Sequence, residues 1–129
     1  SALLGVIAQR LLRRVCRKCG KPYVPEASAL SAFPEPLNAL WPEAGLKGEG
    51  CDSCAGTGYR GRIGAYEVLV ADEGFKEAIR PETPLPVLRE HAVRNGMRLL
   101  LEDGMRKAQD GVTDIDEVSR VLLAETEAL

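Results

Sequence analysis

The stretches "CRKCGKPYVP" (16–25) and "CDSCAGTGYRG" (51–61) contain all four cysteines of this 129-residue chain. Each stretch opens with a C-x-x-C pair, whose tight turn can direct two thiolates at one point. Small residues follow both pairs, Gly20 in the first and Ala55-Gly56 in the second, and they allow backbone amides to turn toward the sulfurs. Four soft ligands are what a structural zinc ion takes in a tetrahedral site. The spacing therefore predicts a structural zinc site at Cys16, Cys19, Cys51 and Cys54.

Two other interpretations of the cysteines stay open. They could be four reduced core residues, or one pair could be the redox site of a thiol–disulfide enzyme. A redox site needs only one pair, set in a thioredoxin-like βαβ context that the sequence does not show. Catalytic zinc keeps an open position and usually uses His or carboxylate ligands. The only histidine, His91, falls on one helical face with Val87, Leu88 and Ala92, which indicates a packing residue.

Composition is typical of a soluble domain. Of the residues, 45% are hydrophobic and 28% are charged, so we expect one domain, or a small domain with an appendage. No apolar run is long enough to cross a membrane, and we expect no direct membrane insertion. The apolar start, "SALLGVIA", lacks the basic region of a signal peptide. We therefore expect a cytoplasmic location, where reduced thiols favour metal binding over disulfides.

Charge is unevenly distributed, although the net charge is only −2. Residues 10–21 contain six basic side chains and no acidic one, whereas residues 101–129 contain eight acidic and three basic side chains. The basic stretch 10–21 favours one alternative function, a zinc-ribbon nucleic-acid-binding domain. The acidic C-terminal region and the lack of aromatic residues for base stacking count against it. Tyr23 and Tyr59 are the only nearby candidates for stacking.

The segments around the cysteines differ in how clearly they specify structure. Prolines and glycines punctuate residues 22–50, which predicts a long connection with one short helix at 26–33. Trp41 lies in this connection, and it either packs the connection against the rest of the domain or anchors a partner protein. Residues 61–70, "GRIGAYEVLV", predict a strand because they are β-branched and aromatic after a glycine-rich turn. Residues 3–14 fit a helical and a strand period equally well, so periodicity leaves them open.

The chain after residue 70 is predicted to be helical. Asp72 can cap a helix at 73–80, and a proline can open the next helix, at 85–95, which ends before Gly96. A third helix covers 97–110 and ends at Gly111. Thr113, with Asp116 three residues later, resembles a capping box and opens a fourth helix, at 114–129.

The usual residue patterns of enzyme sites are missing from the sequence. It contains no G-x-x-x-x-G-K-[ST] phosphate-binding loop. The glycine-rich stretch "GTGYRGRIG" (56–64) precedes a strand and does not open a helix, so it predicts a turn. No Ser/His/Asp set or pair of carboxylates stands out. We expect that this chain alone is not an enzyme.

Three longer stretches resemble the C-terminal part of the secretion ATPases, the hexameric motors of type II secretion and type IV pilus assembly. They are "GVIAQRLLRRVCRKC" (5–19), "CDSCAGTGYRGRIGAYEVL" (51–69) and "GMRLLLEDGMRKAQDGVTDIDEVSRV" (96–121). Retraction motors of the same superfamily have the flanking segments without the tetracysteine insertion, so the resemblance is to the assembly or secretion type. It implies zinc ligation by Cys16, Cys19, Cys51 and Cys54.

This resemblance also implies a fold for the chain and separate roles for its two parts and for the upstream ATP-binding part. The strand before the insertion pairs antiparallel with the strand after it. The implied fold class is α+β: a small antiparallel hairpin interrupted by a tetracysteine zinc-knuckle insertion, followed by a C-terminal helical bundle. Residues 1–70 would form the strand pair with its zinc module (16–60), and residues 71–129 a helical cap. ATP and Mg²⁺ would belong to the missing upstream part of the parent chain.

The partners and location follow from the same resemblance. We expect contacts with neighbouring subunits of a homo-hexamer and with the inner-membrane platform protein. We expect no nucleic acid as a partner. The parent would be cytoplasmic and peripheral to the inner membrane. The sequence does not distinguish pilus assembly from secretion.

Overall fold

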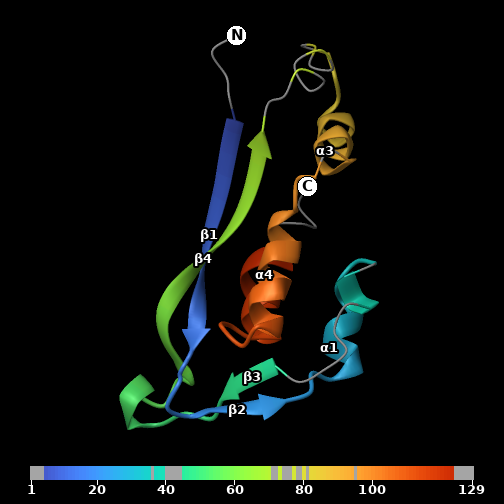
Figure 1. Ribbon diagram of the computed structural model, residues 1–129. Helices are drawn as coiled ribbons and strands as arrows, with labels where there is room; N and C mark the ends of the chain where they lie inside the picture. The colour runs from blue at the N-terminus through green and yellow to red at the C-terminus, as the bar shows by residue number, and fades with distance from the viewer. Residues whose placement is uncertain are drawn as a thin grey trace.

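A computed structural model describes residues 5–35, 37–39, 45–70, 73, 77, 80, 82–94 and 96–123. It is an α+β fold with two separate, two-stranded antiparallel sheets. One sheet pairs β1 (Gly5–Val15) with β4 (Tyr59–Val70), and the other pairs β2 (Gly20–Tyr23) with β3 (Gly45–Gly48). The long β1–β4 pair runs through most of the molecule, with α3 near one end and the β2–β3 sheet near the other (Figure 1).

The segment that periodicity left open is a strand. It pairs antiparallel with the strand that follows the second cysteine pair, which confirms the pairing that the family resemblance implied. Leu12 lies opposite Ile63, and Ile7 lies opposite Val68. Leu12 is fully buried, whereas Ile7 and Val68 are exposed. Because neighbouring side chains along a strand point to opposite faces, the pair has one face in the core and one face in solvent.

The connection between the cysteine pairs contains two short helical turns besides its small sheet. These are α1 (Ala27–Ser31) and η1 (Leu37–Ala39). The helix predicted at 26–33 is therefore confirmed over its five central residues. Phe33 and Leu37 are buried and join the connection to the main core. Trp41, for which a packing or anchoring role was predicted, lies outside the described residues.

The C-terminal half contains α3 (Leu85–Arg94), α4 (Leu100–Gln109) and α5 (Ile115–Val118), and a π-helical turn at Ser119–Leu123 continues α5. The helices predicted at 85–95 and 97–110 are present, and the helix predicted at 114–129 is described as far as residue 123. Of the predicted helix at 73–80, only Glu73, Glu77 and Arg80 are described. None of the helices in the described part of the chain combines the length and apolar character needed to cross a lipid bilayer.

Two predicted helix starts are wrong, one by three residues and one by a single residue. α4 begins at Leu100 and not at Met97, because Leu99 is extended and the Glu67 carboxylate accepts a hydrogen bond from the Leu100 amide at 3.0 Å. The residue that caps α5 is Asp114 and not Thr113. Its carboxylate accepts from the Glu117 amide at 2.9 Å, whereas the Thr113 hydroxyl donates to the Arg13 carbonyl at 2.8 Å.

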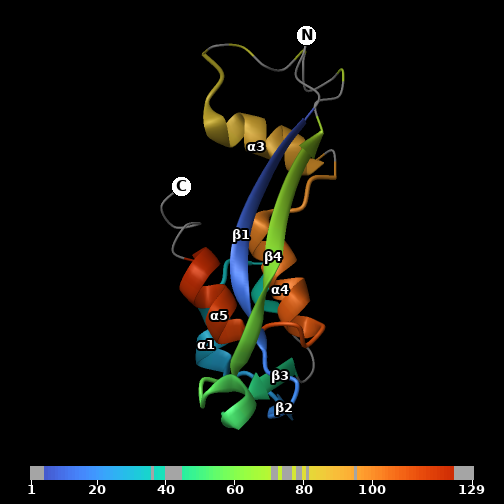
Figure 2. The same cartoon turned by 90° about the vertical axis from the view of Figure 1, so that its left-hand side faces the viewer.

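The main hydrophobic core joins the strand pair, the connection between the cysteine pairs, α4 and the α5 region. α4 packs along the inner face of the strand pair, and α5 lies beside it (Figure 2). A methyl group at Gly104 of α4 would overlap Leu122, so the two helical segments approach closely there. The buried members come from the strand pair, the connection, α4 and the α5 region: Leu12, Ala65, Phe33, Leu37, Leu101, Met105, Ala108, Ile115, Val118, Leu122 and Leu123.

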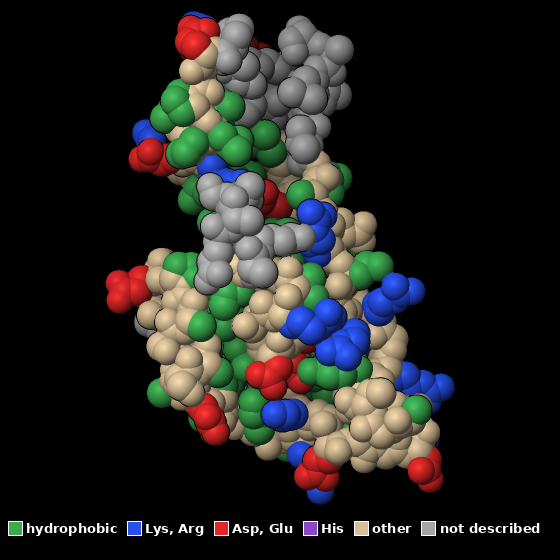
Figure 3. Space-filling model, turned by 180° about the vertical axis from the view of Figure 1, so that it is seen from behind, with side chains coloured by type: hydrophobic (Ala, Val, Ile, Leu, Met, Phe, Trp, Pro, Cys, Tyr) green, Lys and Arg blue, Asp and Glu red, His purple; other side chains and the backbone are tan. Residues whose placement is uncertain are grey.

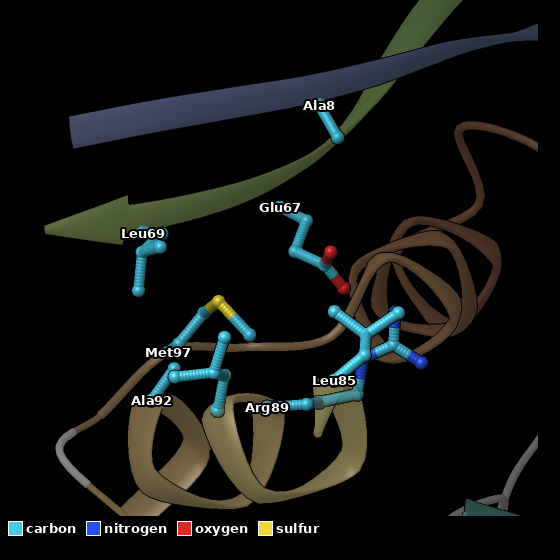
Figure 4. A pocket seen from close by; sticks show the side chains of 8 residues that line it. Ala8, Glu67, Leu69, Leu85, Arg89, Ala92 and Met97 are labelled. Carbon is cyan, nitrogen blue, oxygen red and sulfur yellow. The ribbon is translucent and has the colours of Figure 1, made fainter. Parts of the chain in front are cut away.

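α3 packs less closely than α4. A pocket separates it from the strand pair, with Ala8, Glu67 and Leu69 on the strand side and Leu88, Arg89 and Ala92 on the helix side (Figure 4). Ala92 is the only buried residue among those described in α3. The packing of the C-terminal half onto the rest of the molecule therefore depends mainly on α4 and α5, which contribute most of the helical residues in the core.

Two buried carboxylates cover the outer edges of the strand pair. Asp103 of α4 accepts a hydrogen bond from the Tyr66 amide of β4 at 2.8 Å. Glu117 of α5 accepts from the Arg13 amide of β1 at 2.7 Å, and its carboxylate also binds the guanidinium groups of Arg13 and Arg120. The side chain of Glu117 is completely buried. Each helix is therefore fixed to a strand edge by a charge-assisted hydrogen bond.

Truncating Leu12 should cost much of the stability of the chain. We expect Leu12→Ala to lower the free energy of unfolding by about 2–5 kcal/mol, because it opens a cavity among buried side chains. Leu11→Ala is the matched control, since Leu11 lies next to Leu12 but is 49% exposed. It should change stability by about 0.5 kcal/mol or less. Urea unfolding of both variants measures the difference, and equal losses would contradict the assignment of faces.

Glu117 should make the stability depend on acidity. Burial opposes its ionisation, but hydrogen bonds from Arg120 and Arg13 outweigh burial and lower its pKa from 4.5 to about 2. Because the pKa is lower in the folded state, the stabilisation is fully present above about pH 4.5 and is lost as the pH falls toward 2. We expect Glu117→Gln to cost about 1–3 kcal/mol at neutral pH. The difference in unfolding free energy between wild type and variant should decrease as the pH falls from about 4.5 toward 2.

Urea unfolding at a series of pH values measures this gap. Both proteins carry the same cysteines, so any loss of a bound metal at low pH affects both. Glu90→Gln is the control, since Glu90 is 72% exposed in its ion pair with Arg94. A difference in unfolding free energy between wild type and Glu117→Gln that stays constant from pH 7 to pH 2 would contradict this prediction, because it would mean that the pKa of Glu117 is the same in the folded and unfolded chain.

Candidate metal centre

The four cysteines converge where β1 ends and β4 begins. All four Sγ atoms lie within 4.8 Å of one another. The Sγ–Sγ distance is 3.8 Å for Cys16–Cys51, 3.8 Å for Cys19–Cys54 and 3.7 Å for Cys51–Cys54. Cys16, Cys19 and Cys54 are buried, and Cys51 is partly exposed. The structure therefore brings together every residue that the sequence predicted for the site.

The distances fit a tetrahedral metal ion better than they fit disulfides. Sulfurs placed about 2.3 Å from a common centre at tetrahedral angles are roughly 3.8 Å apart. A disulfide would bring two sulfurs to about 2.05 Å, and all four cysteines are free. A set of four thiolate ligands suits zinc among the common biological metals. The donor set and its geometry therefore fit the zinc ion that the sequence predicted.

The second cysteine pair forms a compact turn that directs amides at sulfur. Cys51 precedes a 3-10 turn, η2 (Asp52–Cys54), and Cys54 is its last residue; Ala55 after it has a left-handed backbone with φ 54°. The Cys54 sulfur accepts hydrogen bonds from the amides of Cys51 and Gly58, both at 3.2 Å. A residue with a Cβ atom rarely adopts this conformation, which glycine takes freely, and Ala55 is the one non-glycine residue with a positive φ in the described part of the chain.

The first pair is tied to the second by backbone hydrogen bonds that cross between them. The Cys16 amide donates to the Gly58 carbonyl at 2.9 Å, and the Gly50 amide donates to the Cys19 sulfur at 3.3 Å. Gly48 and Gly58 lie so close that a Cβ atom on either would overlap the backbone of the other. The end of β3 therefore packs through backbone against the residue that precedes β4, and glycine is required at this contact.

Hydrogen bonding and burial have opposite effects on the pKa values of the thiols. Burial opposes ionisation of Cys54, but the amides of Cys51 and Gly58 outweigh it and lower the pKa of Cys54 to about 6. Hydrogen bonds from the backbone of Cys19 and Lys18 lower the pKa of Cys16. Burial raises the pKa of Cys19 to about 11. The site stabilises negative sulfur at some positions, and four thiolates together would need a bound cation.

Basic side chains surround the cluster, but they have different partners. Arg17 and Lys18, between the first two cysteines, are exposed. Lys21 pairs with Glu49 at 3.0 Å, and Arg60 donates to the Ser53 hydroxyl. Arg13, three residues before Cys16, binds Glu117. Figure 3 shows several Lys and Arg side chains gathered on one face of the molecule, with acidic side chains between some of them.

Sequence reasoning missed the residues that fasten this region to α5. The Tyr59 hydroxyl donates to the Asp114 carboxylate, at 2.7 Å to Oδ2 and 2.8 Å to Oδ1. The Arg13 guanidinium lies 4.1 Å from the centre of the Tyr59 ring. The Tyr23 hydroxyl accepts from the Ile115 amide at 3.3 Å. The available signal was the acidic stretch "TDIDE" (113–117) among apolar residues, because buried carboxylates require partners.

The sequence of this chain is similar to those of several known proteins. The family model described as type II/IV secretion system protein matches residues 1–120. The chain is 39% identical over 118 residues to the type IV pilus assembly ATPase PilB of Thermus thermophilus, covering 92% of this chain and 13% of that protein. It is 35% identical over 125 residues to the type II secretion system ATPase E of Vibrio cholerae, covering 94% of this chain and 24% of that protein.

A third relative is the type II secretion system protein E of Pseudomonas aeruginosa, 37% identical over 121 residues, with 94% of this chain and 24% of that protein covered. The chain thus spans between 13% and 24% of the length of these relatives. The match to the family model covers nearly all of the described residues, including both cysteine pairs and α5. The chain belongs to the type II/IV secretion system protein family.

Proposed function

We propose that this chain is the non-catalytic, zinc-binding C-terminal module of a hexameric ATPase that powers type IV pilus assembly or type II protein secretion. The observation that carries the proposal is the cluster of four sulfurs, spaced as a tetrahedral ion requires, in a chain of this family. Two of the relatives quoted are named as ATPases, one of pilus assembly and one of type II secretion.

In this proposal the zinc ion is structural. Cys16, Cys19, Cys51 and Cys54 would occupy all four tetrahedral positions, which leaves none for a substrate or a water molecule. The ion would supply a cross-link and no reaction chemistry. The amides of Cys51, Gly58 and Gly50 would orient the sulfurs and share their negative charge. The zinc module (16–60) would then project as a rigid unit from the end of the strand pair.

The strand pair supports the idea that this chain is one part of a larger protein. Its outer face exposes the apolar side chains Ile7, Leu11, Tyr66, Val68 and Val70. An apolar face of this kind usually marks an interface. In the parent protein, residues 1–70 would carry the zinc module and residues 71–129 would form a helical cap. ATP and Mg²⁺ would bind to the upstream part.

The proposed role of the module is mechanical contact. It would touch neighbouring subunits of a homo-hexamer or the inner-membrane platform protein, in the cytoplasm at the inner membrane. A zinc-ribbon nucleic-acid-binding domain remains the competing function. Its basic stretch, 10–21, is partly engaged within the molecule, since Arg13 binds Glu117 and Lys21 binds Glu49. DNA binding with a steep dependence on salt would favour that competitor.

The purified chain should contain one zinc ion per molecule. We expect all four thiols to resist a thiol reagent until a chelator removes the metal, because each sulfur is a ligand. Metal analysis by mass spectrometry, with thiols counted before and after chelation, measures this. Cys51→Ser with Cys54→Ser should abolish zinc binding, whereas Ser53→Ala, between the same two ligands, should retain it. Two disulfides and no metal would contradict the proposal.

The chain should not respond to ATP. No phosphate-binding loop is present in its sequence, so about 1 mM Mg-ATP should be neither hydrolysed nor able to raise the melting temperature. Phosphate release and thermal unfolding measure the two effects. Adding zinc to the metal-depleted chain is the positive control for stabilisation by a ligand. Hydrolysis, or a melting temperature that rises with ATP concentration, would contradict the non-catalytic role.

A further inference from the structure

The first turn of α5 is held by three different strands around the cysteine cluster. Its cap, Asp114, accepts from the Tyr59 hydroxyl at the start of β4. The amide of Ile115 donates to the Tyr23 hydroxyl at the end of β2. Asp116 pairs with Lys47 of β3 at 3.3 Å. The cap and the first two residues of α5 therefore each contact one strand that leaves or approaches a cysteine pair.

Tyr59 provides the shortest route from sulfur to helix. It directly follows Gly58, whose amide donates to the Cys54 sulfur and whose carbonyl accepts from the Cys16 amide. Its hydroxyl lies within 2.8 Å of both oxygens of the Asp114 carboxylate. That carboxylate also accepts from the Glu117 amide in α5. The backbone that contacts two ligand residues and the side chain that binds the helix cap thus belong to adjacent residues, Gly58 and Tyr59.

The contacts differ in their expected strength. Asp114 is 2% exposed and Ile115 is 1% exposed. Losing the Tyr59 hydroxyl would remove a hydrogen bond from each oxygen of the buried Asp114 carboxylate. Losing the Tyr23 hydroxyl would remove the acceptor of the buried Ile115 amide, and both losses are costly. The Lys47–Asp116 pair is more than half exposed on both sides and contributes little. The two tyrosines are therefore the effective links.

The N-terminal part of α4 is held by contacts away from the cysteines, and only its C-terminal end approaches β3. Its N-terminal amide at Leu100 donates to Glu67, and its Asp103 accepts from the Tyr66 amide. Both partners lie on β4, beyond the region that the cysteines enclose. Its buried side chains pack with Leu12 and Ala65 of the strand pair. Releasing the cysteines from one another would leave these contacts in place.

We propose that Tyr59 and Tyr23 couple occupancy of the cysteine site to the first turn of α5, so that zinc binding closes this turn and zinc loss opens it while α4 stays folded. The inference rests on the proposed function, in which the four cysteines bind zinc. With the metal bound, β2 and the start of β4 are held at fixed positions, and both hydroxyls meet their partners. Without it, these strands move apart and Asp114 loses its partner.

The coupling must act in both directions. If zinc favours the closed turn by a given factor, then the closed turn favours zinc by the same factor. Removing a tyrosine hydroxyl should therefore weaken zinc binding, even though neither tyrosine is a ligand. A tyrosine that only packs in the core would show no such effect when replaced by phenylalanine.

Hydrogen exchange at single amides tests the first direction. The amides of Glu117 and Val118 bond to Asp114 and report on the turn, and the amides of Met105 and Ala108 report on α4. Removing zinc with a chelator should speed exchange at Glu117 and Val118 by about fivefold or more. Exchange at Met105 and Ala108 should change much less.

Zinc affinity, measured against a competing chelator, tests the second direction. Tyr59→Phe should weaken zinc binding by about fivefold or more and speed exchange at Glu117 and Val118 in the zinc-loaded chain. Tyr23→Phe should act in the same direction. Tyr66→Phe is the matched control, since the exposed Tyr66 hydroxyl accepts only a 3.2 Å bond from Gln9 among the bonds described and does not touch α5. It should leave both measurements unchanged.

The outcomes separate this inference from the proposed function. One zinc per chain, with unchanged exchange in α5 after its removal, would overturn the coupling and leave the zinc site intact. Loss of protection in α4 and α5 together would also overturn it, because the metal would then hold the whole fold. Failure to bind zinc at all would overturn both proposals.

Discussion

The meeting of four cysteine sulfurs at the base of a long connection is the constraint on which the rest of the structure depends. Cys16 and Cys51 are 35 positions apart, and their sulfurs lie 3.8 Å from each other. Closing a flexible loop of that length costs about 3 kcal/mol of chain entropy. The connection is rich in proline and glycine, and its small sheet could not offset such a cost alone. A bound metal would supply the missing free energy.

The strand pair benefits directly from this closure. β1 ends one residue before Cys16, and β4 begins five residues after Cys54. Holding the sulfurs together therefore brings the two strands to the position at which their pairing starts. The closed connection then contributes two buried side chains, Phe33 and Leu37, to the core that also contains residues of α4 and α5. The proposed zinc module and the helices are separate in sequence but contribute to one core.

The sequence was informative where function depends on local spacing. The cysteine cluster follows from two C-x-x-C pairs, and the strand at 61–70 follows from its own composition. The pairing of β1 with β4 came only from the family resemblance, because periodicity did not distinguish strand from helix at 3–14. The start of α4 was misplaced because Glu67, 33 residues away, satisfies its first amide. The links through Tyr23 and Tyr59 span 92 and 55 positions, and no local pattern encodes such contacts.

The central claim is that one metal ion joins all four cysteines. X-ray absorption at the zinc edge of the purified chain tests it most directly, because the method counts the donor atoms and measures their distances. The account predicts four sulfur donors at about 2.3 Å and no nitrogen or oxygen in the first coordination shell. A shell with fewer sulfurs, completed by nitrogen or oxygen, would contradict it, because the site would then be open or shared with other residues.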